Sequence, residues 1–211
     1  MSQSNIQYRA IQPSDYKALQ KIICATWNYE RFCSPKTAAK LARLFLSSCL
    51  KNQTYTCVAL NGGEPVGVIM GKNERTHRPP MRYTLRQIGS ILAMLAGREG
   101  REVLRNFDGF DQINKSLYGE NTRKFGGEVA FFAVRSDQRG TGIGKELFAR
   151  VQGYMKSQDI SDFYLFTDST CNYGFYNHQG MEPVCKRTYR IKAYNNQETS
   201  FFLYGSRPAE G

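Results

Sequence analysis

A glycine-rich turn between an apolar run and an amphipathic segment constrains this chain more than any other feature of its sequence. The turn reads Arg139-Gly140-Thr141-Gly142-Ile143-Gly144-Lys145. The run 129–134 before it is continuously apolar, and Ile143, Leu147, Val151 and Tyr154 recur after it at helical spacing. The pattern predicts a buried strand, a turn that lets the backbone approach a ligand, and a helix whose first N–H groups can bind a phosphate.

Two common phosphate-binding loops do not fit this turn. A P-loop, G-x-x-x-x-G-K-[ST], fails because position 139 is Arg and position 146 is Glu. A dinucleotide fingerprint, G-x-G-x-x-G, fails because its third glycine would fall on Lys145 or on Leu147. The pattern that fits is R-x-x-G-x-G, from Arg139 through Gly142 to Gly144. A tight strand–helix turn that merely needs glycine is the alternative.

The other periodicities predict one mixed α/β domain over residues 1–211, with a central sheet of about seven strands flanked by helices. The expected strands cover 6–11, 54–60, 66–70, 128–134, 162–167, 184–194 and 199–205. The expected helices begin near 13 and 34, follow the glycine-rich turn, and cover 170–179. Hairpin turns are expected at Asn61-Gly62-Gly63-Glu64 and at Asn195-Asn196.

Residues 72–127 interrupt this order between the third and fourth strands. A structureless loop of that length would be anomalous in a compact domain, so we expect a helical insertion. One helix would carry the stripe Leu85, Ile88, Leu92 and Leu95, which we expect to belong to the core. A second would carry Val103, Phe107, Phe110, Ile113 and Leu117 and be broken near Gly109.

The chain is strongly basic, with 29 Lys plus Arg against 18 Asp plus Glu and a net charge of +11. Residues 1–50 carry seven basic and two acidic side chains and residues 71–126 carry eleven and six, so each segment has a charge of +5. Such a surface attracts nucleic acid, lipid or a phosphorylated ligand, but no zinc finger, RNP signature or basic zipper is present. Arg98, Arg101 and Arg105 alternate with glutamates, which favours a solvated face over a site for an acidic substrate or a nucleic acid.

The six cysteines and two histidines form no pattern typical of a metal site. No C-x-x-C pair exists, and His77 and His178 lie in unrelated segments. The first residues lack the features of a secretory signal, and the apolar run 91–96 is far shorter than the ~20 residues of a membrane span. We therefore expect no metal, no membrane partner and reduced thiols in a cytoplasmic protein.

The R-x-x-G-x-G turn, the strand before it, the helix after it and the order of elements together resemble the GNAT superfamily of acyl-CoA-dependent N-acyltransferases. The resemblance covers nearly the whole chain apart from the insertion. It implies that the amides of Gly140 to Lys145 wrap the pyrophosphate of CoA. The binding residues of the turn would be Arg139, Gly140, Thr141, Gly142, Ile143, Gly144 and Lys145. The sheet would open beside the strand 128–134, so that the pantetheine arm bonds the backbone near Phe132 and Val134.

The segment after the next strand also resembles the family. Members often carry Y-x-x-x-G-F there, and Tyr176 to Gly180-Met181 matches with Met in place of Phe. The resemblance implies that Tyr176 protonates the leaving thiolate, and a half-buried packing tyrosine is the alternative. Where the family often has an Asn, this chain has Ser169. Asn172 lies one helical turn before Tyr176 and would either contact CoA or cap the helix, and we expect His178 to be exposed.

A carboxylate at the start of the central strand is the candidate general base. Histone-acetylating members carry a glutamate at the place of Glu128. An acceptor amine must lose a proton to attack a thioester, so the resemblance implies that Glu128 accepts it. A solvated strand-entry carboxylate is the alternative, and Asp168, at the end of the next strand, is the rival base.

These observations predict an N-acetyltransferase that moves an acetyl group from acetyl-CoA directly to a primary amine of a small molecule or peptide. The alternative from another class is a non-catalytic acyl-CoA-binding regulator on the same fold. Nucleic acid is disfavoured as a partner, and a homodimer stays open. We expect the insertion to cover or flank the acceptor site. The acceptor itself is unreadable, because resemblance is least in the segments that would select it.

Overall fold

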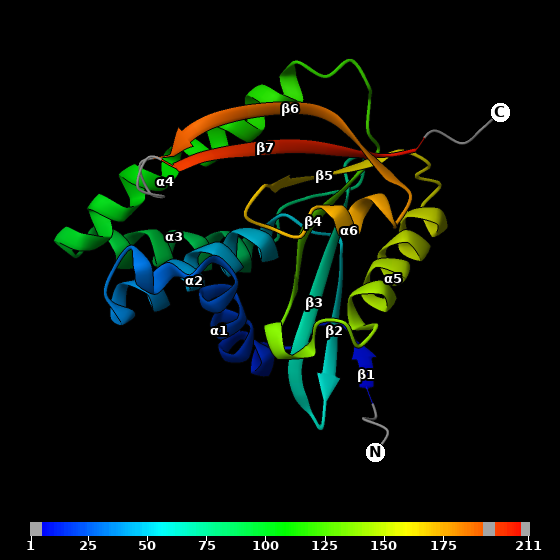
Figure 1. Ribbon diagram of the computed structural model, residues 1–211. Coiled ribbons are helices and arrows are strands. Elements are labelled where there is room, and N and C mark those ends of the chain that lie inside the picture. The colour runs from blue at the N-terminus through cyan, green and yellow to red at the C-terminus, as the bar shows by residue number, and fades with distance from the viewer. Residues whose placement is uncertain (1–5, 192–196, 208–211) are drawn as a thin grey trace.

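A seven-stranded mixed sheet runs through the computed structural model, which describes residues 6–191 and 197–207 (Figure 1). The strands are β1 (Ile6–Arg9), β2 (Tyr55–Asn61), β3 (Glu64–Asn73), β4 (Gly127–Val134), β5 (Phe163–Asp168), β6 (Met181–Ile191) and β7 (Gln197–Ser206). Their order in the sheet is β1-β2-β3-β4-β5-β7-β6. Neighbours are antiparallel except β4 and β5, which are parallel. The predicted fold class and order of elements are therefore confirmed.

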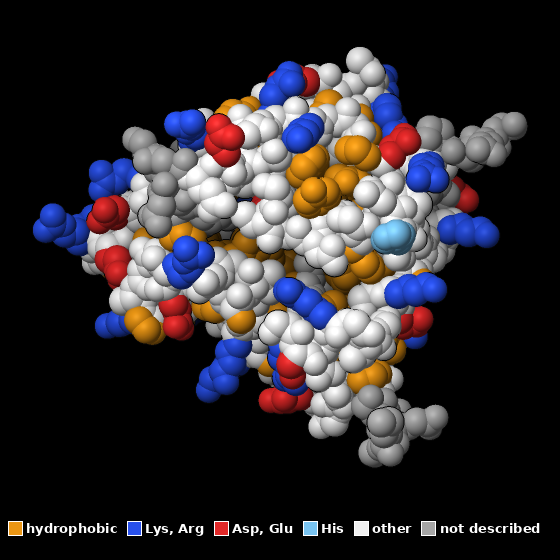
Figure 2. Space-filling view, in the orientation of Figure 1, with side chains coloured by type: hydrophobic (Ala, Val, Ile, Leu, Met, Phe, Trp, Pro, Cys, Tyr) orange, Lys and Arg blue, Asp and Glu red, His pale blue; other side chains and the backbone are white. Residues whose placement is uncertain are grey.

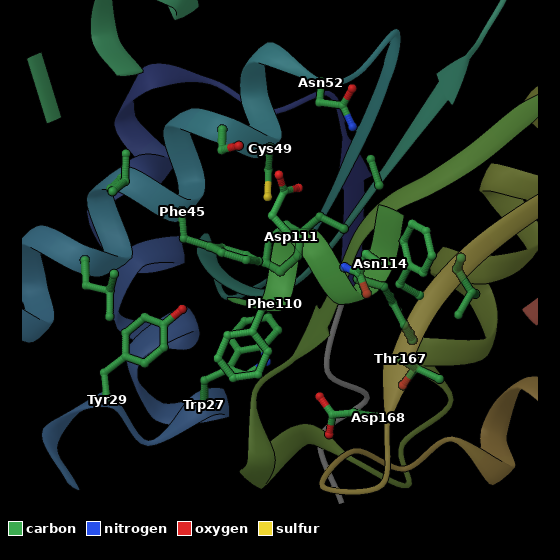
Figure 3. A pocket seen from close by; sticks show the side chains of 18 of the residues that line it. Trp27, Tyr29, Phe45, Cys49, Asn52, Phe110, Asp111, Asn114, Thr167 and Asp168 are labelled. Atoms are coloured by element: carbon green, nitrogen blue, oxygen red, sulfur yellow. The ribbon is translucent and has the colours of Figure 1, made fainter. Parts of the chain in front are cut away.

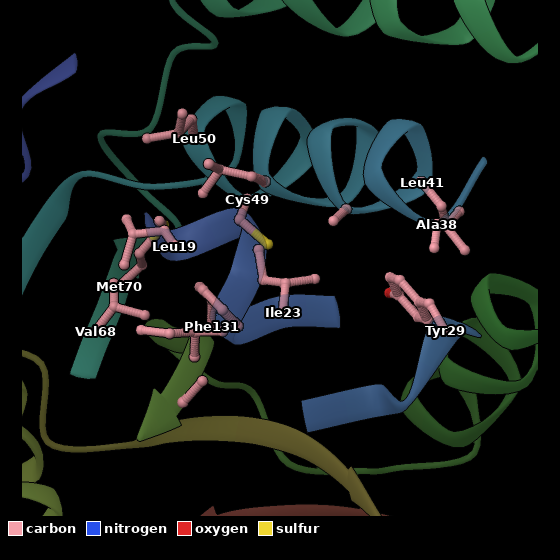
Figure 4. Close-up of a cluster of buried hydrophobic side chains, with 14 of the residues drawn as sticks. Leu19, Ile23, Tyr29, Ala38, Leu41, Cys49, Leu50, Val68, Met70 and Phe131 are labelled. Atoms are coloured by element: carbon pink, nitrogen blue, oxygen red, sulfur yellow. The ribbon is translucent and has the colours of Figure 1, made fainter. Parts of the chain in front are cut away.

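Helices cover both faces of the sheet. They are α1 (Tyr16–Trp27), α2 (Pro35–Lys51), α3 (Met81–Leu95), α4 (Arg98–Gly119), α5 (Ile143–Ser157) and α6 (Gly174–Asn177), with 3-10 turns at Pro13–Asp15, Tyr29–Arg31 and Ser136–Gln138. Side chains alternate across a strand, so Val68 and Met70 of β3 face α1 and α2 (Figure 4). Ile69, between them, faces α5. Helix α4 packs over β6 and β7 instead, with Leu117 buried against Phe201 and Leu203.

Local chemistry explains several boundaries. Ser34 caps α2 by accepting a hydrogen bond from the N–H of Thr37, and Pro35 occupies the first turn, where its missing N–H costs nothing. Gly62 and Gly63 both have positive φ, as the two-residue turn between β2 and β3 requires. The predicted helix over 170–179 is shorter than expected, Gly174–Asn177, and the Asn195-Asn196 turn lies outside the described residues.

The insertion between β3 and β4 consists of α3 and α4, as predicted, but two of its details were wrong. Helix α4 is continuous through Gly109 because an isolated glycine lowers helix stability without breaking the helix. The stripe Leu85, Ile88, Leu92 and Leu95 does not belong to the core. Together with Met81 these side chains are 43–72% exposed. The opposite face of α3, with Ser90 and Met94, is the buried one.

Helix α3 packs on α2 through polar contacts, which explains why its apolar stripe faces away. The hydroxyls of Ser47 and Ser90 lie 3.4 Å apart, and Lys40 donates a hydrogen bond to the carbonyl of Ala93. Glu99, in the first turn of α4, accepts hydrogen bonds from the N–H and hydroxyl of Ser34 at 2.7 and 2.6 Å. The insertion is thus tied to the start of α2. Within the described residues, no helix combines the length and apolarity needed to cross a bilayer.

Candidate active site

Strands β4 and β5 pair only where they begin. The pairs are Gly127 with Phe163 and Glu128 with Tyr164, and no further pair is recorded along these two strands. Strand β4 stays paired with β3 up to Val134. One edge of the second half of β4 is therefore left without a strand partner.

The backbone amides along that edge face the opening. The N–H of Arg135 donates a hydrogen bond to the carbonyl of Val66 on the β3 side at 2.8 Å. Because amides alternate in direction along a strand, those of Phe132 and Val134 point away from β3, toward the separated β5. Phe132 and Val134 are the residues for which the family resemblance implies pantetheine contacts, and pantetheine binding there stays a prediction.

The glycine-rich turn lies at the end of the same strand. Gly140 and Gly142 have φ of 79° and 88°, which side-chain-bearing residues rarely adopt, and a Cβ on either would meet open space. Gly142 is the N-cap of α5 and provides no side chain to cap it, so the first N–H groups of the helix are available to an anion. Arg139, Thr141 and Lys145 are exposed around these amides.

The two other residues predicted in the turn have packing roles. Ile143 is buried against the sheet under α5. A Cβ on Gly144 would lie 3.5 Å from the ring of Phe132 and 3.7 Å from Val134. This close approach brings the start of α5 against the open half of β4, so the turn and the strand edge form one continuous surface.

A cavity of about 1130 Å³ opens beside β4 (Figures 2 and 3). Its walls come from α1, α2, α3, α4, α6, β4, β5 and β7, and Figure 2 shows apolar side chains in a hollow of this face. Both helices of the insertion contribute, α3 through Gln87, Ile91 and Leu95 and α4 through residues that include Arg101 and Phe110. The insertion therefore flanks the cavity. Glu128, Asp168 and Tyr176 line the same cavity, so the structure brings together all the predicted proton-transfer candidates.

An irregularity in β4 decides which side chains enter this cavity. Met70 pairs with Phe131 but Gly71 pairs with Val129, so Ala130 is an extra residue in β4. Such a bulge shifts the alternation of side chains by one position. Glu128 and Phe131 consequently face the same side of the sheet, whereas in a regular strand they would face opposite sides.

Glu128 is held in a polar network. Lys72, its neighbour across β3 and β4, forms an ion pair with its Oε2 at 2.7 Å, and Asn52 donates a hydrogen bond to the same oxygen at 3.2 Å. Lys72 also pairs with Glu74 at 2.8 Å. Burial alone would lower the pKa of Lys72, but the two carboxylates outweigh it and hold that pKa above its usual value. The network fixes the carboxylate of Glu128 at the cavity wall through one of its two oxygens.

Asp168 ends β5 at another part of the cavity. Its Oδ1 accepts hydrogen bonds from the N–H and the hydroxyl of Thr170. Among the described residues Asp168 forms no ion pair. The two candidate bases therefore differ, since Glu128 is already paired with a cation and Asp168 is not.

Tyr176 lies on α6 among aromatic rings. Its ring centroid is 6.4 Å from that of Phe132 and 6.0 Å from that of Phe148. Burial, followed by the nearby Cys171, raises the pKa of Tyr176 well above its ordinary value. The phenol therefore keeps its proton throughout the neutral range and remains available as a proton donor next to the open edge of β4.

Of three residues close to Tyr176 in the sequence, one lines the cavity and two are exposed. Cys171 lines the cavity, and burial together with Asp168 raises its pKa to about 11, so its thiol is protonated at neutral pH. Asn172 is exposed and does not line the cavity, and its carbonyl accepts a hydrogen bond from the N–H of Phe175 at the start of α6. His178 is exposed, as expected.

Sequence reasoning missed the partners of Glu128. Lys72 follows the predicted strand 66–70, and Asn52 follows the predicted helix that begins near residue 34. Nothing in the sequence shows that these two residues lie beside Glu128. The available signal was a lysine two residues beyond the apolar stretch 66–70. No cluster of three or more His, Cys, Asp or Glu side chains suited to a metal exists in the described part of the chain. All six cysteines are free thiols.

The comparisons with known proteins agree with this geometry. A family model described as "Acetyltransferase (GNAT) family" matches residues 17–181. That range starts in α1 and ends at the first residue of β6, so it contains the turn, the open strand and every cavity wall except β7. No curated protein sequence matches the chain.

Solved structures share the fold of this chain. PH1933 from Pyrococcus horikoshii OT3 superposes with a TM-score of 0.61 at 16% identity, covering 96% of this chain and 98% of that one. A putative phosphinothricin N-acetyltransferase gives 0.57 at 15% identity, with 98% and 100% covered. The PaiA N-acetyltransferase from Thermoplasma acidophilum, solved in complex with coenzyme A, gives 0.53 at 12% identity, with 96% and 99% covered.

Proposed function

The chain belongs to the acetyltransferase (GNAT) family, and from that membership we propose that it transfers an acetyl group from acetyl-CoA directly to a primary amine. One observation carries the proposal. The side chains of Glu128 and Tyr176 and the open edge of β4 line one cavity, and the uncapped start of α5 lies against the same strand at Phe132. A donor thioester and an acceptor amine can therefore be held on the same surface.

The residues present fit acetyl-CoA as the acetyl donor. The amides after Gly142 and the side chains of Arg139 and Lys145 would hold the pyrophosphate, because both groups favour anions. The amides of Phe132 and Val134 would hold the pantetheine arm, since they lack a strand partner. The bound thioester would supply the activated acetyl group. A solved relative contains coenzyme A, which makes the same ligand a reasonable choice for this chain.

The transfer needs three actions from the protein. Glu128 accepts a proton from the acceptor amine, directly or through water, so that the neutral amine attacks the thioester carbon. A backbone N–H of β4 near Phe132 or Val134 donates a hydrogen bond to the carbonyl oxygen as it gains negative charge. Tyr176 donates its proton to the departing sulfur. The products are the acetylated amine and free CoA.

Direct transfer is favoured over an acyl-enzyme by the state of Cys171. This thiol lines the cavity, but burial raises its pKa to about 11, and a thiol is a poor nucleophile until it loses its proton. Asp168, the neighbouring carboxylate, further opposes the thiolate. Initial-rate kinetics should therefore show a ternary complex, and ping-pong kinetics or acetyl-Cys171 in a mass spectrum would contradict the proposal.

Cofactor binding is tested with Gly142→Asp, which places a carboxylate beside the pyrophosphate. Calorimetry with CoA should show that binding is lost. Gly153→Asp is the control, because Gly153 also has open space around it but lies toward the other end of α5, away from the turn. Equal affinity in both variants would refute the assigned CoA site.

Proton transfer is tested with Tyr176→Phe, Glu128→Gln and Asp168→Asn. Removing a proton-transfer group typically costs ~10²–10⁴-fold in rate, so Tyr176→Phe should lower kcat by that amount while CoA still binds. Tyr173→Phe, on the exposed neighbouring tyrosine, should keep full activity. Glu128→Gln should slow the reaction most at low pH, where the amine is protonated. Should Asp168→Asn show that pH dependence instead, the base is Asp168.

A further inference from the structure

Aromatic side chains dominate one part of the cavity. Trp27 at the end of α1 and Phe45 of α2 pack together, with ring centroids 4.9 Å apart (Figure 3). The ring of Phe131 of β4 lies 5.5 Å from that of Phe45. All three line the cavity. Leu41 and Leu44 of α2 extend this apolar wall by one further turn.

A second aromatic pair comes from elements that are distant in sequence. Phe110 of α4 and Phe201 of β7 lie 5.7 Å apart and also line the cavity. Rings from five different elements therefore face one space. Such a lining makes favourable contacts with a ligand whose apolar part is the size of a side chain. It makes fewer favourable contacts with a ligand that is polar along its whole length.

The charges around the cavity disfavour a polycation. Of its three carboxylates, Glu128 is paired with Lys72 at 2.7 Å and Asp111 with Lys115 at 2.6 Å. Asp168 alone of the three forms no ion pair with a described residue.

Two arginines add positive charge to the same cavity. Arg101 and Arg105 of α4 are exposed, and neither has an acidic partner among the described side chains. Arg101 donates a hydrogen bond to the carbonyl of Leu95, which holds its guanidinium by the end of α3. The positive charge of these two arginines on the α4 wall would oppose a ligand that brings several positive charges to that wall.

We propose that the acceptor is a primary monoamine whose single positive charge sits on an apolar body of aromatic size, and that polyamines, aminoglycosides and lysine-rich peptides are excluded. This inference rests on the proposed function, because it names the substrate class of the same site. The apolar body packs among Trp27, Phe45 and Phe131. The amino group lies toward Glu128, whose side chain the bulge in β4 places on the same face as Phe131.

Binding can be tested without turnover, because Trp27 is the one tryptophan of the chain and lines the cavity. The probes are 2-phenylethylamine, n-butylamine and spermidine, titrated against the full chain with CoA present while tryptophan fluorescence is recorded. We expect 2-phenylethylamine to bind at least about tenfold more tightly than n-butylamine, since apolar contacts of this kind discriminate by ~10–200-fold. Spermidine should be the weakest ligand. Tighter binding of spermidine, or no binding of 2-phenylethylamine, would overturn the proposal.

Two sets of variants test the two parts of the argument. Phe45→Ala should raise the KM for 2-phenylethylamine by ~10–200-fold and leave the KM for n-butylamine nearly unchanged. Tyr173→Ala, an exposed aromatic residue outside the cavity, is the matched control. Replacing Arg101 and Arg105 together by Gln should improve spermidine as a ligand and not 2-phenylethylamine. An equal effect of Phe45→Ala on both amines, or no gain for spermidine, would contradict the inference.

The outcomes also separate this inference from the proposed function. If CoA binds and spermidine is acetylated with the higher kcat/KM, the substrate class is wrong and the acetyltransferase assignment stands. If calorimetry shows no CoA binding to the unmodified chain, the proposed function itself fails. Fluorescence binding of 2-phenylethylamine would then show only that the cavity takes apolar amines.

Discussion

Helices α3 and α5 are each 15 residues long and each carry an apolar stripe at helical spacing, yet their stripes have opposite environments. In α5 the stripe Ile143, Leu147, Val151 and Met155 is buried against the sheet. In α3 the stripe from Met81 to Leu95 is exposed. Helix α5 follows a central strand through a short turn and must pack back on that sheet, whereas α3 packs on α2 through its small and polar face. Periodicity predicts a helix, but the neighbouring element decides which face is buried.

The largest expected difference between the two helices is in the free energy of unfolding that is lost when a leucine is replaced by alanine. Leu147 is 0% exposed, so Leu147→Ala should lower the free energy of unfolding by about 2–5 kcal/mol. Leu85→Ala, the same change on the exposed stripe, should alter it by no more than about 0.5 kcal/mol. Urea unfolding measures both. A comparable loss for Leu85→Ala would show that the stripe of α3 is covered in solution.

A second test replaces one glycine by alanine beside α5 and another within α3. A Cβ on Gly71 would lie 2.8 Å from Cγ2 of Val151, a stiff side chain, so Gly71→Ala should cost about 1–3 kcal/mol through overpacking. Gly89 in α3 has open space around it, and Gly89→Ala should stabilise the helix by about 0.5–1 kcal/mol. Thermal unfolding of the two variants should therefore shift in opposite directions, and a shift in the same direction would break the comparison.

The charged side chains of the two helices should cause a smaller difference in stability. Glu146 and Arg150 of α5 form an i,i+4 ion pair at 2.8 Å, whereas α3 contains no acidic residue. Glu146→Gln should lower stability by about 0.3–0.5 kcal/mol in dilute buffer. Because salt screens exposed charges, the loss should vanish at about 1 M salt. A loss that persists at high salt would mean that the pair is not solvent-exposed.

The smallest expected effect concerns the exposed stripe itself. Replacing Leu85 and Leu92 together by Ser should leave the unfolding free energy nearly unchanged, within about 0.5 kcal/mol per site. The same variant should bind less of a fluorescent apolar dye in its native state, because exposed leucines are the surface that such a dye contacts. Unchanged dye binding would show that the stripe is not accessible in solution.

Much of the fold could be predicted from local signals. The Gly62-Gly63 turn, the Ser34-Pro35 helix start and the apolar run 129–134 each depend on a few neighbouring residues, and each is found where it was expected. The exposure of the α3 stripe could not be predicted, because it depends on which face of α3 packs against α2, a helix that is distant in the sequence. The continuity of α4 through Gly109 was also missed, since one glycine weakens a helix without ending it.

The candidate site divides in the same way. Gly140 and Gly142 have the positive φ that a glycine-rich turn indicates, and Tyr176 lies beside Phe132 of the open strand, while the roles of these residues in binding and catalysis stay predictions. The bulge at Ala130 was invisible, because an extra alanine within an apolar strand changes neither composition nor hydropathy. The ion pair of Glu128 with Lys72 depends on register across two strands, which a single sequence does not show.

The separation of β4 from β5 has a consequence for how the backbone exchanges its hydrogens with solvent. Along one strand, successive amides alternate between a bonded edge and a bare edge, as with Arg135, which bonds Val66, and Val134, which faces the opening. In deuterated water the Val134 and Phe132 amides should exchange rapidly and the Arg135 amide slowly. Saturation with CoA should then slow the first two while leaving Arg135 unchanged, so that β4 becomes uniformly protected only when the donor is bound.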